Sequence, residues 1–179
     1  MPDPEILAKR ERARRATAEK RARQAARFWQ EARSIKGTLG ERYLRGRGIS
    51  CELPGTLRFH PQCWHGPTGR RLPAMVALVQ GGDAFSVHRT YLAADSRGKA
   101  AVEPAKAMLG STQHGAARLT EAQGPLVVAE GVETALSLAS GLLGQPATIW
   151  AALSTSGMRG LRLPPAPGRL TIATDSDDR

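Results

Sequence analysis

The chain has 179 residues, a formal net charge of +10 and 41% hydrophobic residues, which suits one globular domain with an appendage. It contains no apolar run long enough for a membrane span, and its charged N-terminus is unlike a secretory signal, so we expect a cytoplasmic protein without membrane partners. The two cysteines, Cys51 and Cys63, give no disulfide framework. The positive charge favours polyanionic partners, because neutralised phosphates release their counterions.

Residues 1–36 form a basic arm. They hold eleven Lys or Arg against five Asp or Glu, a net charge of +6. Residues 5–33 contain no Pro or Gly and are rich in Ala, Arg, Lys, Glu and Gln, which favours a helix. The apolar positions before Phe28 and Trp29 are almost all Ala, so we expect a long solvated helix that packs only near those two residues. A surface helix and an arm that follows nucleic-acid phosphates both fit this pattern.

Residues 37–122 are predicted to form a mixed α+β region. A short helix is expected over residues 41–45, and the apolar run 73–79 (PAMVALV) is expected to be a buried strand. Residues 84–92 (AFSVHRTYL) are typical of a partner strand. Because Gly81-Gly82 between the two strands is a turn signal, they are predicted to form an antiparallel hairpin.

Residues 123–179 show alternating strands and helices. Apolar strands are expected over 126–129, 148–153 and 170–174, with a periodic helix over 132–143 and a helical turn over 158–161. Continuous apolar strands in this order predict an α/β fold with a parallel sheet covered on both faces. Ligands bind such sheets beyond the carboxyl ends of the strands.

Three carboxylates fall at those strand ends. Glu130-Gly131 follows the first strand, and Asp175 and Asp177 follow the third. Residues i and i+2 of an extended segment point to one side, so the two Asp side chains can converge, and Glu130 joins them if the strands are neighbours. Hard oxygen ligands of this kind suit Mg²⁺ or Mn²⁺ and a phosphate-bearing substrate. Gly131 is expected to permit a sharp turn and a close ligand approach.

Two further patterns leave alternatives open. Glu133 lies in the first turn of the predicted helix, so it is either a charge favoured by the helix dipole or a residue that supports or joins the metal ligands. Separately, two cysteines and two histidines could hold Zn²⁺, although they lack the paired Cys-x-x-Cys spacing of structural zinc sites. These four residues are Cys51, His60, Cys63 and His65.

Three segments resemble the Toprim domain of phage- and plasmid-type primases, a domain shared by topoisomerases, bacterial primases and related nucleases. They are LVVAEGVETALSLASG (126–141), IWAALSTSGMRGL (149–161) and RLTIATDSDD (169–178). The resemblance covers roughly residues 125–178, and the family's invariant Glu and Asp-x-Asp match Glu130, Asp175 and Asp177. It implies a Rossmann-like core, Mg²⁺ binding and phosphoryl-transfer chemistry.

The segments before residue 123 are similar to the region upstream of Toprim in those primases. They are YLRGRGI (43–49), LRFHP (57–61), PAMVALV (73–79), VHRTYL (87–92) and PAKAMLG (104–110). In bacterial primases a basic subdomain precedes Toprim and faces the same cleft. The resemblance therefore implies that Arg89 and Lys106 contact template or nucleotide phosphates.

These features predict a mobile-element DNA primase that makes RNA primers from ribonucleotides on single-stranded DNA, with a replicative helicase as a candidate partner. Asp175 and Asp177 would hold Mg²⁺, and Glu130 would bind metal or act as a general acid or base. A Toprim nuclease or topoisomerase-like enzyme and a non-catalytic DNA-binding remnant are the alternatives. The family pattern continues with another helix and strand, whereas this chain ends at Arg179, so we expect a C-terminally truncated, incomplete Toprim core with little activity by itself.

Overall fold

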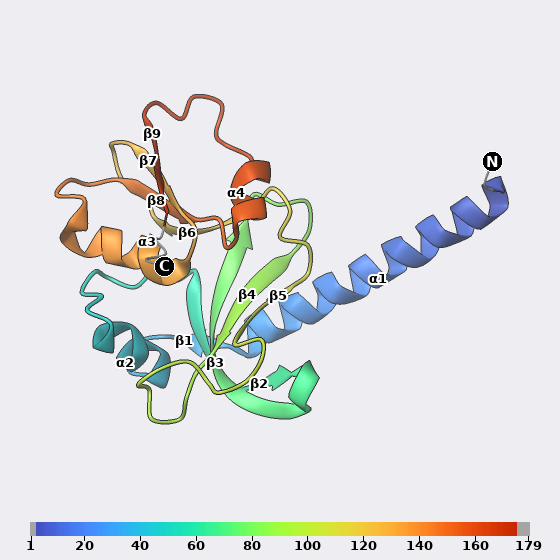
Figure 1. Ribbon diagram of the computed structural model, residues 1–179, viewed down its shortest axis with the longest axis horizontal. Coiled ribbons are helices and arrows are strands. Elements are labelled where there is room, and N and C mark those ends of the chain that lie inside the picture. Colours follow the sequence, from blue (N-terminus) through green and yellow to red (C-terminus); the bar gives the residue numbers. More distant parts are fainter. Residues whose placement is uncertain (1–2, 175–179) are drawn as a thin grey trace, which may run out of the picture.

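A mixed sheet of nine strands runs through residues 3–174, the part of the chain that the computed structural model describes. The strands are β1 (Arg33–Ser34), β2 (Leu57–His65), β3 (Arg70–Gln80), β4 (Ser86–Tyr91), β5 (Lys106–Leu109), β6 (Ala116–Thr120), β7 (Leu126–Ala129), β8 (Thr148–Ala151) and β9 (Leu170–Ala173). The main path has the order β1-β2-β3-β6-β8-β7-β9, and β4 and β5 extend from β3 (Figure 1).

Helices cover both faces of this sheet. They are α1 (Pro4–Glu31), α2 (Leu39–Gly46), η1 (Gly66–Thr68), α3 (Val132–Ser137), η2 (Leu138–Leu142) and α4 (Thr155–Gly160). Apolar residues of α2 and α3 share one hydrophobic core with β3, β6, β7 and β8. On the other face, α1 packs against β3 and β4, and α4 packs against β7 and β8. Within the described part of the chain, no helix has both the length and the apolar character that crossing a membrane requires.

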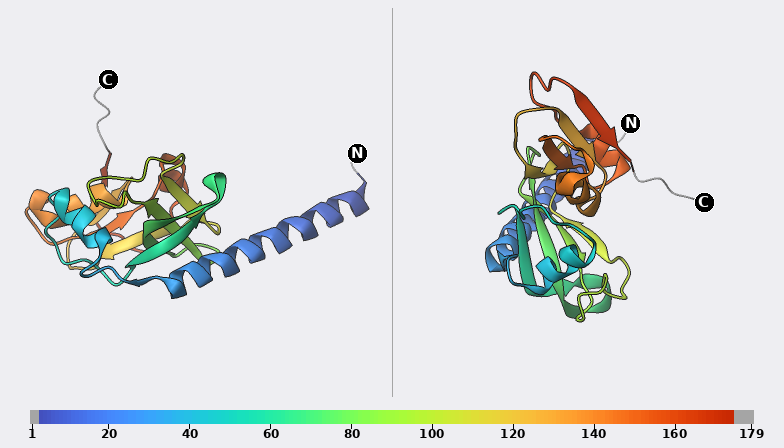
Figure 2. Two further views of the ribbon diagram at one scale, coloured as in Figure 1. Left: turned by 90° about the horizontal axis from the view of Figure 1, so that it is seen from below. Right: turned by 90° about the vertical axis from the view of Figure 1, so that its left-hand side faces the viewer.

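The basic arm is a 28-residue helix that projects from the body of the protein (Figures 1 and 2). Asp3 caps its N-terminus, because its side chain accepts a hydrogen bond from the amide of Glu5 at 2.9 Å. Ala25 is the one fully buried residue of α1, and Phe28 and Trp29 are partly buried near its end. The predicted solvated helix that packs only near Phe28 and Trp29 is therefore confirmed.

The predicted hairpin of residues 73–92 is also confirmed. β3 and β4 pair in antiparallel register, with Val79 opposite Ser86 on either side of the Gly81-Gly82 turn. Sequence patterns did not indicate β2, β5 or β6. β2 contains an irregularity between His60 and Cys63, and β5 is only four residues long, so neither shows regular alternation.

Residues 126–173 form the predicted α/β unit, which confirms the fold class. β7 lies between β8 and β9 and is parallel to both, so the first and third strands of the unit are neighbours, as expected. The parallel pairing is limited to these three strands, because β6 joins β8 in antiparallel direction. The expected cover on both faces is incomplete, since Leu170 and Ile172 of β9 are exposed. The predicted helix over 132–143 is split into α3 and the π-helical η2, where Gly141 has a φ of 120°.

Contacts between the two halves of the chain are extensive. β6 pairs with β3 through Val79 and Gln80, and with β8 on its other side. A polar cluster adds a second link: Asp83 accepts from Arg162 at 2.9 Å and lies 2.8 Å from His114. The basic region and the α/β unit are consequently parts of one continuous sheet.

Candidate functional site

Glu130 stands at the carboxyl end of β7, at the edge of the sheet where parallel strands place ligand sites. Its backbone carbonyl accepts a hydrogen bond from Leu153 at 2.7 Å, and the Thr155 hydroxyl donates to its Oε1 at 3.3 Å. Leu153 has a φ of 72°, which is unusual for a residue other than glycine and costs conformational energy. The loop from β8 to α4 is thus held in a strained conformation that brings Thr155 to the Glu130 carboxylate.

The Glu130 carboxylate keeps free coordination capacity. It is half-buried, its hydrogen bond from Thr155 is long, and among residues 3–174 no Lys or Arg forms an ion pair with it. β9 is in register with β7, with Ala173 opposite Ala129, so β9 ends at the same edge of the sheet. Asp175 and Asp177, the other predicted metal ligands, lie outside the described residues.

Glu133 is a buried carboxylate with two donors from distant parts of the chain. Lys106 Nζ donates to its Oε2 at 2.9 Å, and the Tyr43 hydroxyl donates to its Oε1 at 3.0 Å. Burial is the largest influence on its pKa and raises it, but the charge and hydrogen bond of Lys106 and the backbone amide of Glu133 outweigh burial and lower the pKa to about 2. Glu133 is therefore ionised at neutral pH and fixes the position of Lys106.

Gly131 lies beside this pair, and the sharp turn expected at this glycine is absent. Its φ of −108° and ψ of 158° are extended values that any residue adopts, so no sharp turn requires it. A Cβ at this position would lie 3.8 Å from Glu133 Oε2 and 4.0 Å from Lys106 Nζ, which are ordinary contacts. The structure thus brings Gly131, Glu133 and Lys106 together, next to Glu130 in the chain.

A row of buried polar side chains lies on the same face of the sheet as Lys106. Ser86, His88 and Thr90 occupy every second position of β4, so their side chains point to one face of the sheet. Thr90 lies directly opposite Lys106 of the neighbouring strand β5. Ser86 Oγ, His88 Nδ1 and Thr90 Oγ1 have no hydrogen-bond partner among the described residues. Burial, followed by the charge of Lys106, lowers the pKa of His88 to about 4, so its ring is neutral at physiological pH.

Sequence reasoning did not identify Tyr43 and Lys99 as neighbours of this site. Tyr43 donates to Glu133 from 90 positions earlier in the chain, and burial together with the Glu133 carboxylate raises the pKa of its hydroxyl. Partial burial, followed by the charge of Lys106, lowers the pKa of Lys99. No local motif marks either residue, because the fold alone brings these segments together.

Arg89, the other predicted phosphate contact, faces away from Lys106. It lies between His88 and Thr90 in β4, and its guanidinium is 5.7 Å from the Phe28 ring of α1. Its NH1 donates to the Trp64 carbonyl at 3.3 Å. The structure therefore does not bring Arg89 together with Glu130.

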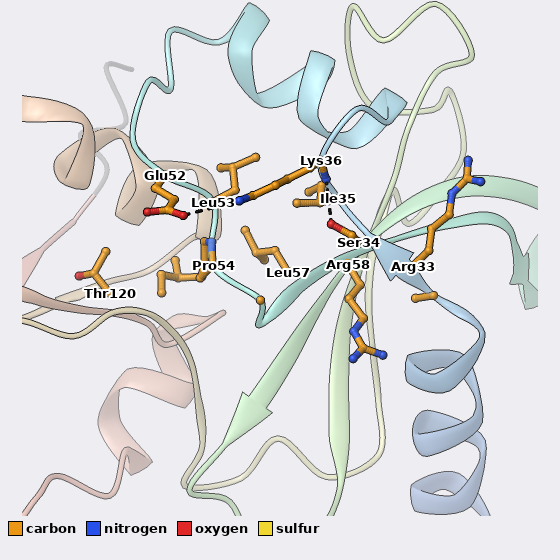
Figure 3. Close-up of a pocket in the computed structure, with 13 residues that line it drawn as sticks. Arg33, Ser34, Ile35, Lys36, Glu52, Leu53, Pro54, Leu57, Arg58 and Thr120 are labelled. Atoms are coloured by element: carbon orange, nitrogen blue, oxygen red, sulfur yellow. Dashed lines mark hydrogen bonds and ion pairs between the residues drawn. The ribbon is translucent and has the colours of Figure 1, made fainter.

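Two cavities of the molecule were compared with the positions of the predicted site residues. A cleft of about 570 Å³ lies between residues 108–114 and the start of α4, lined by Met108, Ser154 and Gly157 among others. Two of its lining residues, Ser154 and Ser156, flank Thr155 in the chain. A groove of about 810 Å³ lies elsewhere, along β1 and the segment before β2 (Figure 3). No predicted site residue lines this groove, and its Lys36 is paired with Glu52 at 3.6 Å.

The residues considered for zinc are engaged in separate contacts. His60 is 3.2 Å from Glu31, whereas His65 lies 2.8 Å from the Thr68 hydroxyl and 3.0 Å from the Pro104 carbonyl. Cys63 is buried, and Cys51 lies near the Leu136 carbonyl. Over residues 3–174, no three His, Cys, Asp or Glu side chains are gathered in a way that could hold a metal ion.

Comparison with known proteins gives two family matches. A family described as a domain of unknown function (DUF7146) matches residues 19–119, more than half of the chain, and the Toprim domain matches residues 125–179. No curated protein and no solved structure matches the chain. The Toprim match begins just before β7 and includes Glu130, Asp175 and Asp177. The chain therefore belongs to the DUF7146 family and carries, after that domain, a Toprim domain of the kind found in metal-dependent primases, nucleases and topoisomerases.

Proposed function

We propose that this protein is a DNA primase-like nucleotidyltransferase that joins ribonucleotides into RNA primers on single-stranded DNA. The observation that carries the proposal is the parallel pairing of β7 with β9 in the Toprim domain. Because Ala129 lies opposite Ala173, Glu130 stands where β9 leads into Asp175 and Asp177. In this proposal Asp175 and Asp177 join Glu130 at that edge, and three carboxylates next to a basic region would form the setting that phosphoryl transfer requires.

The residues present fit a hard divalent cation. Glu130 has open lone pairs and no ion-pair partner within residues 3–174, and carboxylate oxygens are the preferred ligands of Mg²⁺ and Mn²⁺. Asp175 and Asp177 would hold the metal together with Glu130. When bound, Mg²⁺ would neutralise charge on the nucleotide phosphates. Glu130 would also accept or return the proton of an attacking hydroxyl.

Lys106 has the position and exposure to contact a phosphate group in the same reaction. Its side chain is 35% exposed, and the Glu133 carboxylate holds its ammonium group in place. The neutral ring of His88 and the hydroxyl of Thr90 lie on the same face of the sheet. In this proposal Glu133 is a positioning residue, which acts through Lys106.

A topoisomerase-like reaction is less well supported, because it needs a nucleophilic tyrosine. The chain has two tyrosines, Tyr43 and Tyr91, and both are buried. Their hydroxyls donate to Glu133 and to the Trp64 carbonyl. Burial raises the pKa of both groups, that of Tyr91 to about 12, which opposes formation of a nucleophilic phenolate.

The proposal is tested by primer synthesis with the chain extended by the helix and strand that complete the Toprim pattern, in the presence of single-stranded DNA, labelled ribonucleotides and Mg²⁺. Glu130→Gln is expected to lower primer synthesis by at least about 100-fold, since it removes a metal ligand or an acid–base group. Glu121→Gln is the matched control, because Glu121 is an exposed glutamate between β6 and β7.

Three outcomes would contradict the primase proposal. Primer synthesis that survives Glu130→Gln would remove the carboxylate site from the reaction. Glu130-dependent nicking of DNA without primers would favour a Toprim nuclease. A folded protein that binds single-stranded DNA and Mn²⁺ but performs neither reaction would favour a non-catalytic DNA-binding role.

A further inference from the structure

A further pocket lies on the face of the sheet that α1 covers, opposite Lys106. It has a volume of about 440 Å³, within the range of small-molecule sites. The last turns of α1 contribute Arg27 and Phe28, β2 contributes Trp64, and β3 and β4 contribute Arg71 and Arg89. The pocket therefore combines two aromatic residues with three arginines.

Arg89 is the unusual member of this pocket, because it is a buried cation without an acidic partner. It is 9% exposed, and its Nε has no hydrogen-bond partner in the part of the chain that the structure describes. Its NH1 and NH2 donate to the carbonyls of Trp64 and Met108, at 3.3 and 3.4 Å. No carboxylate among residues 3–174 forms an ion pair with it. A buried charge without a counter-ion is costly, so this guanidinium is poised for an anionic ligand.

Glu31, the acidic residue that lines the pocket, already interacts with two side chains other than Arg89. Glu31 Oε1 accepts from Arg27 at 2.7 Å, and Glu31 Oε2 lies 3.2 Å from His60. The rings of Phe28 and Tyr91 each lie 5.7 Å from the Arg89 guanidinium and offset part of the cost of its burial. They supply no negative charge, so the pocket keeps a net positive character.

Trp64 supplies the apolar wall. It is 43% exposed, and the Arg71 guanidinium lies 5.9 Å from its ring centroid. Its backbone carbonyl accepts from the Tyr91 hydroxyl at 2.7 Å, which fixes this part of β2. An exposed indole beside arginines is suited to stacking on a nucleobase while the arginines contact a phosphate.

We infer that this pocket binds one base–phosphate unit of single-stranded nucleic acid. The strand is favoured over a free nucleotide because α1 leads away from the pocket with further exposed arginines, Arg21 and Arg23. The site lies on the other face of the sheet from Lys106, so it would hold the strand away from the lysine that the proposed reaction uses. The inference is independent of the proposed primase reaction, since it needs neither a metal nor Glu130.

The test measures binding of a fluorescein-labelled twelve-residue oligothymidylate to the full-length protein by anisotropy, with EDTA present to exclude metal-dependent binding. Trp64→Ala and Arg71→Gln are each expected to weaken binding by about tenfold, because stacking or a phosphate contact is lost. Arg70→Gln is the matched control: it removes the same charge from the adjacent exposed position of β3, outside the pocket. This control is expected to change the affinity by less than about twofold.

Arg89→Met separates a ligand-binding role from a structural one. It keeps the apolar bulk and removes the unpaired charge, so binding should fall while the thermal unfolding temperature stays equal or rises. Unlabelled ATP, added as a competitor, distinguishes the source of the base–phosphate unit. Displacement by ATP would assign the pocket to a free nucleotide, and its failure would assign the pocket to the strand.

The inference is overturned if Trp64→Ala and Arg71→Gln bind the oligothymidylate, and are competed by ATP, as strongly as Arg70→Gln is. It is also overturned if Arg89→Met lowers the unfolding temperature and leaves binding unchanged. Because none of these readouts involves primer synthesis, failure of this site and failure of the primase proposal can be told apart.

Discussion

Lys106 donates from Nζ to Glu133 Oε2 at 2.9 Å, and this bond joins the basic region to the first turn of the Toprim helix. The two residues are 27 positions apart in the sequence, and Glu133 follows Glu130 by three positions. A lysine held in this way presents its ammonium group in a fixed place at the start of the helix that follows Glu130. The pair is therefore the structural connection between the two halves of the proposed site.

Replacing Glu133 with glutamine should destabilise the protein, because it leaves the Lys106 charge without its partner. Lys106 is one-third exposed, so the loss should be about 1–3 kcal/mol, below the cost of breaking a fully buried pair. Urea unfolding at pH 7 measures the change. The control Glu121→Gln, on an exposed loop, should change the free energy of unfolding by less than about 0.5 kcal/mol. Equal stability of Glu133→Gln and the control would show that the ion pair contributes nothing net.

The same carboxylate predicts a loss of stability in acid. The pKa of Glu133 is about 2 in the folded protein and 4.5 ordinarily, so the unfolded chain binds the proton more readily. The contribution of the ionised Glu133 carboxylate to folding stability is complete above about pH 4.5 and is lost as the pH falls towards 2. The difference in unfolding free energy between wild type and Glu133→Gln should shrink over that window. A constant difference between pH 5 and pH 2.5 would contradict the lowered pKa.

His88 acts in a separate and higher pH window. Its folded pKa of about 4 lies below the ordinary 6.5, so the unfolded state takes up the proton first and stability falls as the pH drops from about 6.5 to 4. The loss should reach roughly 3 kcal/mol at most. Replacing His88 with glutamine should flatten the stability profile in this range. An unaltered profile in the variant would assign the pH dependence to other groups.

Metal binding is expected to require the three Toprim carboxylates together. Mn²⁺ titration followed by water proton relaxation should detect weak binding in the wild type. Asp175→Asn combined with Asp177→Asn should abolish it, because neutral amides are poorer ligands for hard cations. Glu121→Gln is again the matched control. Equal Mn²⁺ binding by the wild type and the double variant would exclude these residues as ligands.

The projecting part of α1 should contribute to nonspecific binding of single-stranded DNA. Replacing Arg10, Arg12 and Arg14 with glutamine removes three exposed positive charges without touching the packed end of the helix. If each arginine neutralises a phosphate, the slope of log affinity against log salt should fall by about 0.7 per residue. Replacing the same residues with lysine preserves the charge and should leave the slope unchanged. If the glutamine variant keeps the wild-type slope, α1 is only a solvated helix.

The sequence predicted the Toprim elements well, because their signals are local. β7, β8 and β9 are short apolar runs, and Glu130 falls at the end of β7 as expected. The partners of Glu133 could not be foreseen in this way, because Tyr43 reaches it from α2 and Lys106 reaches it from β5. Arg89 and Lys106 were given one role from resemblance, whereas the register of β4 with β5 sets them on opposite faces. The face of the sheet to which a side chain points depends on how its strand is paired, and local sequence patterns did not reveal the pairing of β5.

The pairing of β6 with both β3 and β8 has a consequence for dividing the protein. The family matches at 19–119 and 125–179 suggest a cut between them, but such a cut would separate β6 from β8. The isolated C-terminal piece would then carry a bare strand edge at β8, with Trp150 and Ile149 no longer shielded, and exposed edges of this kind promote association between copies. The border between the two family matches is therefore not a structural border, and a piece of the Toprim domain that keeps β8 covered by β6 would have to begin before residue 116.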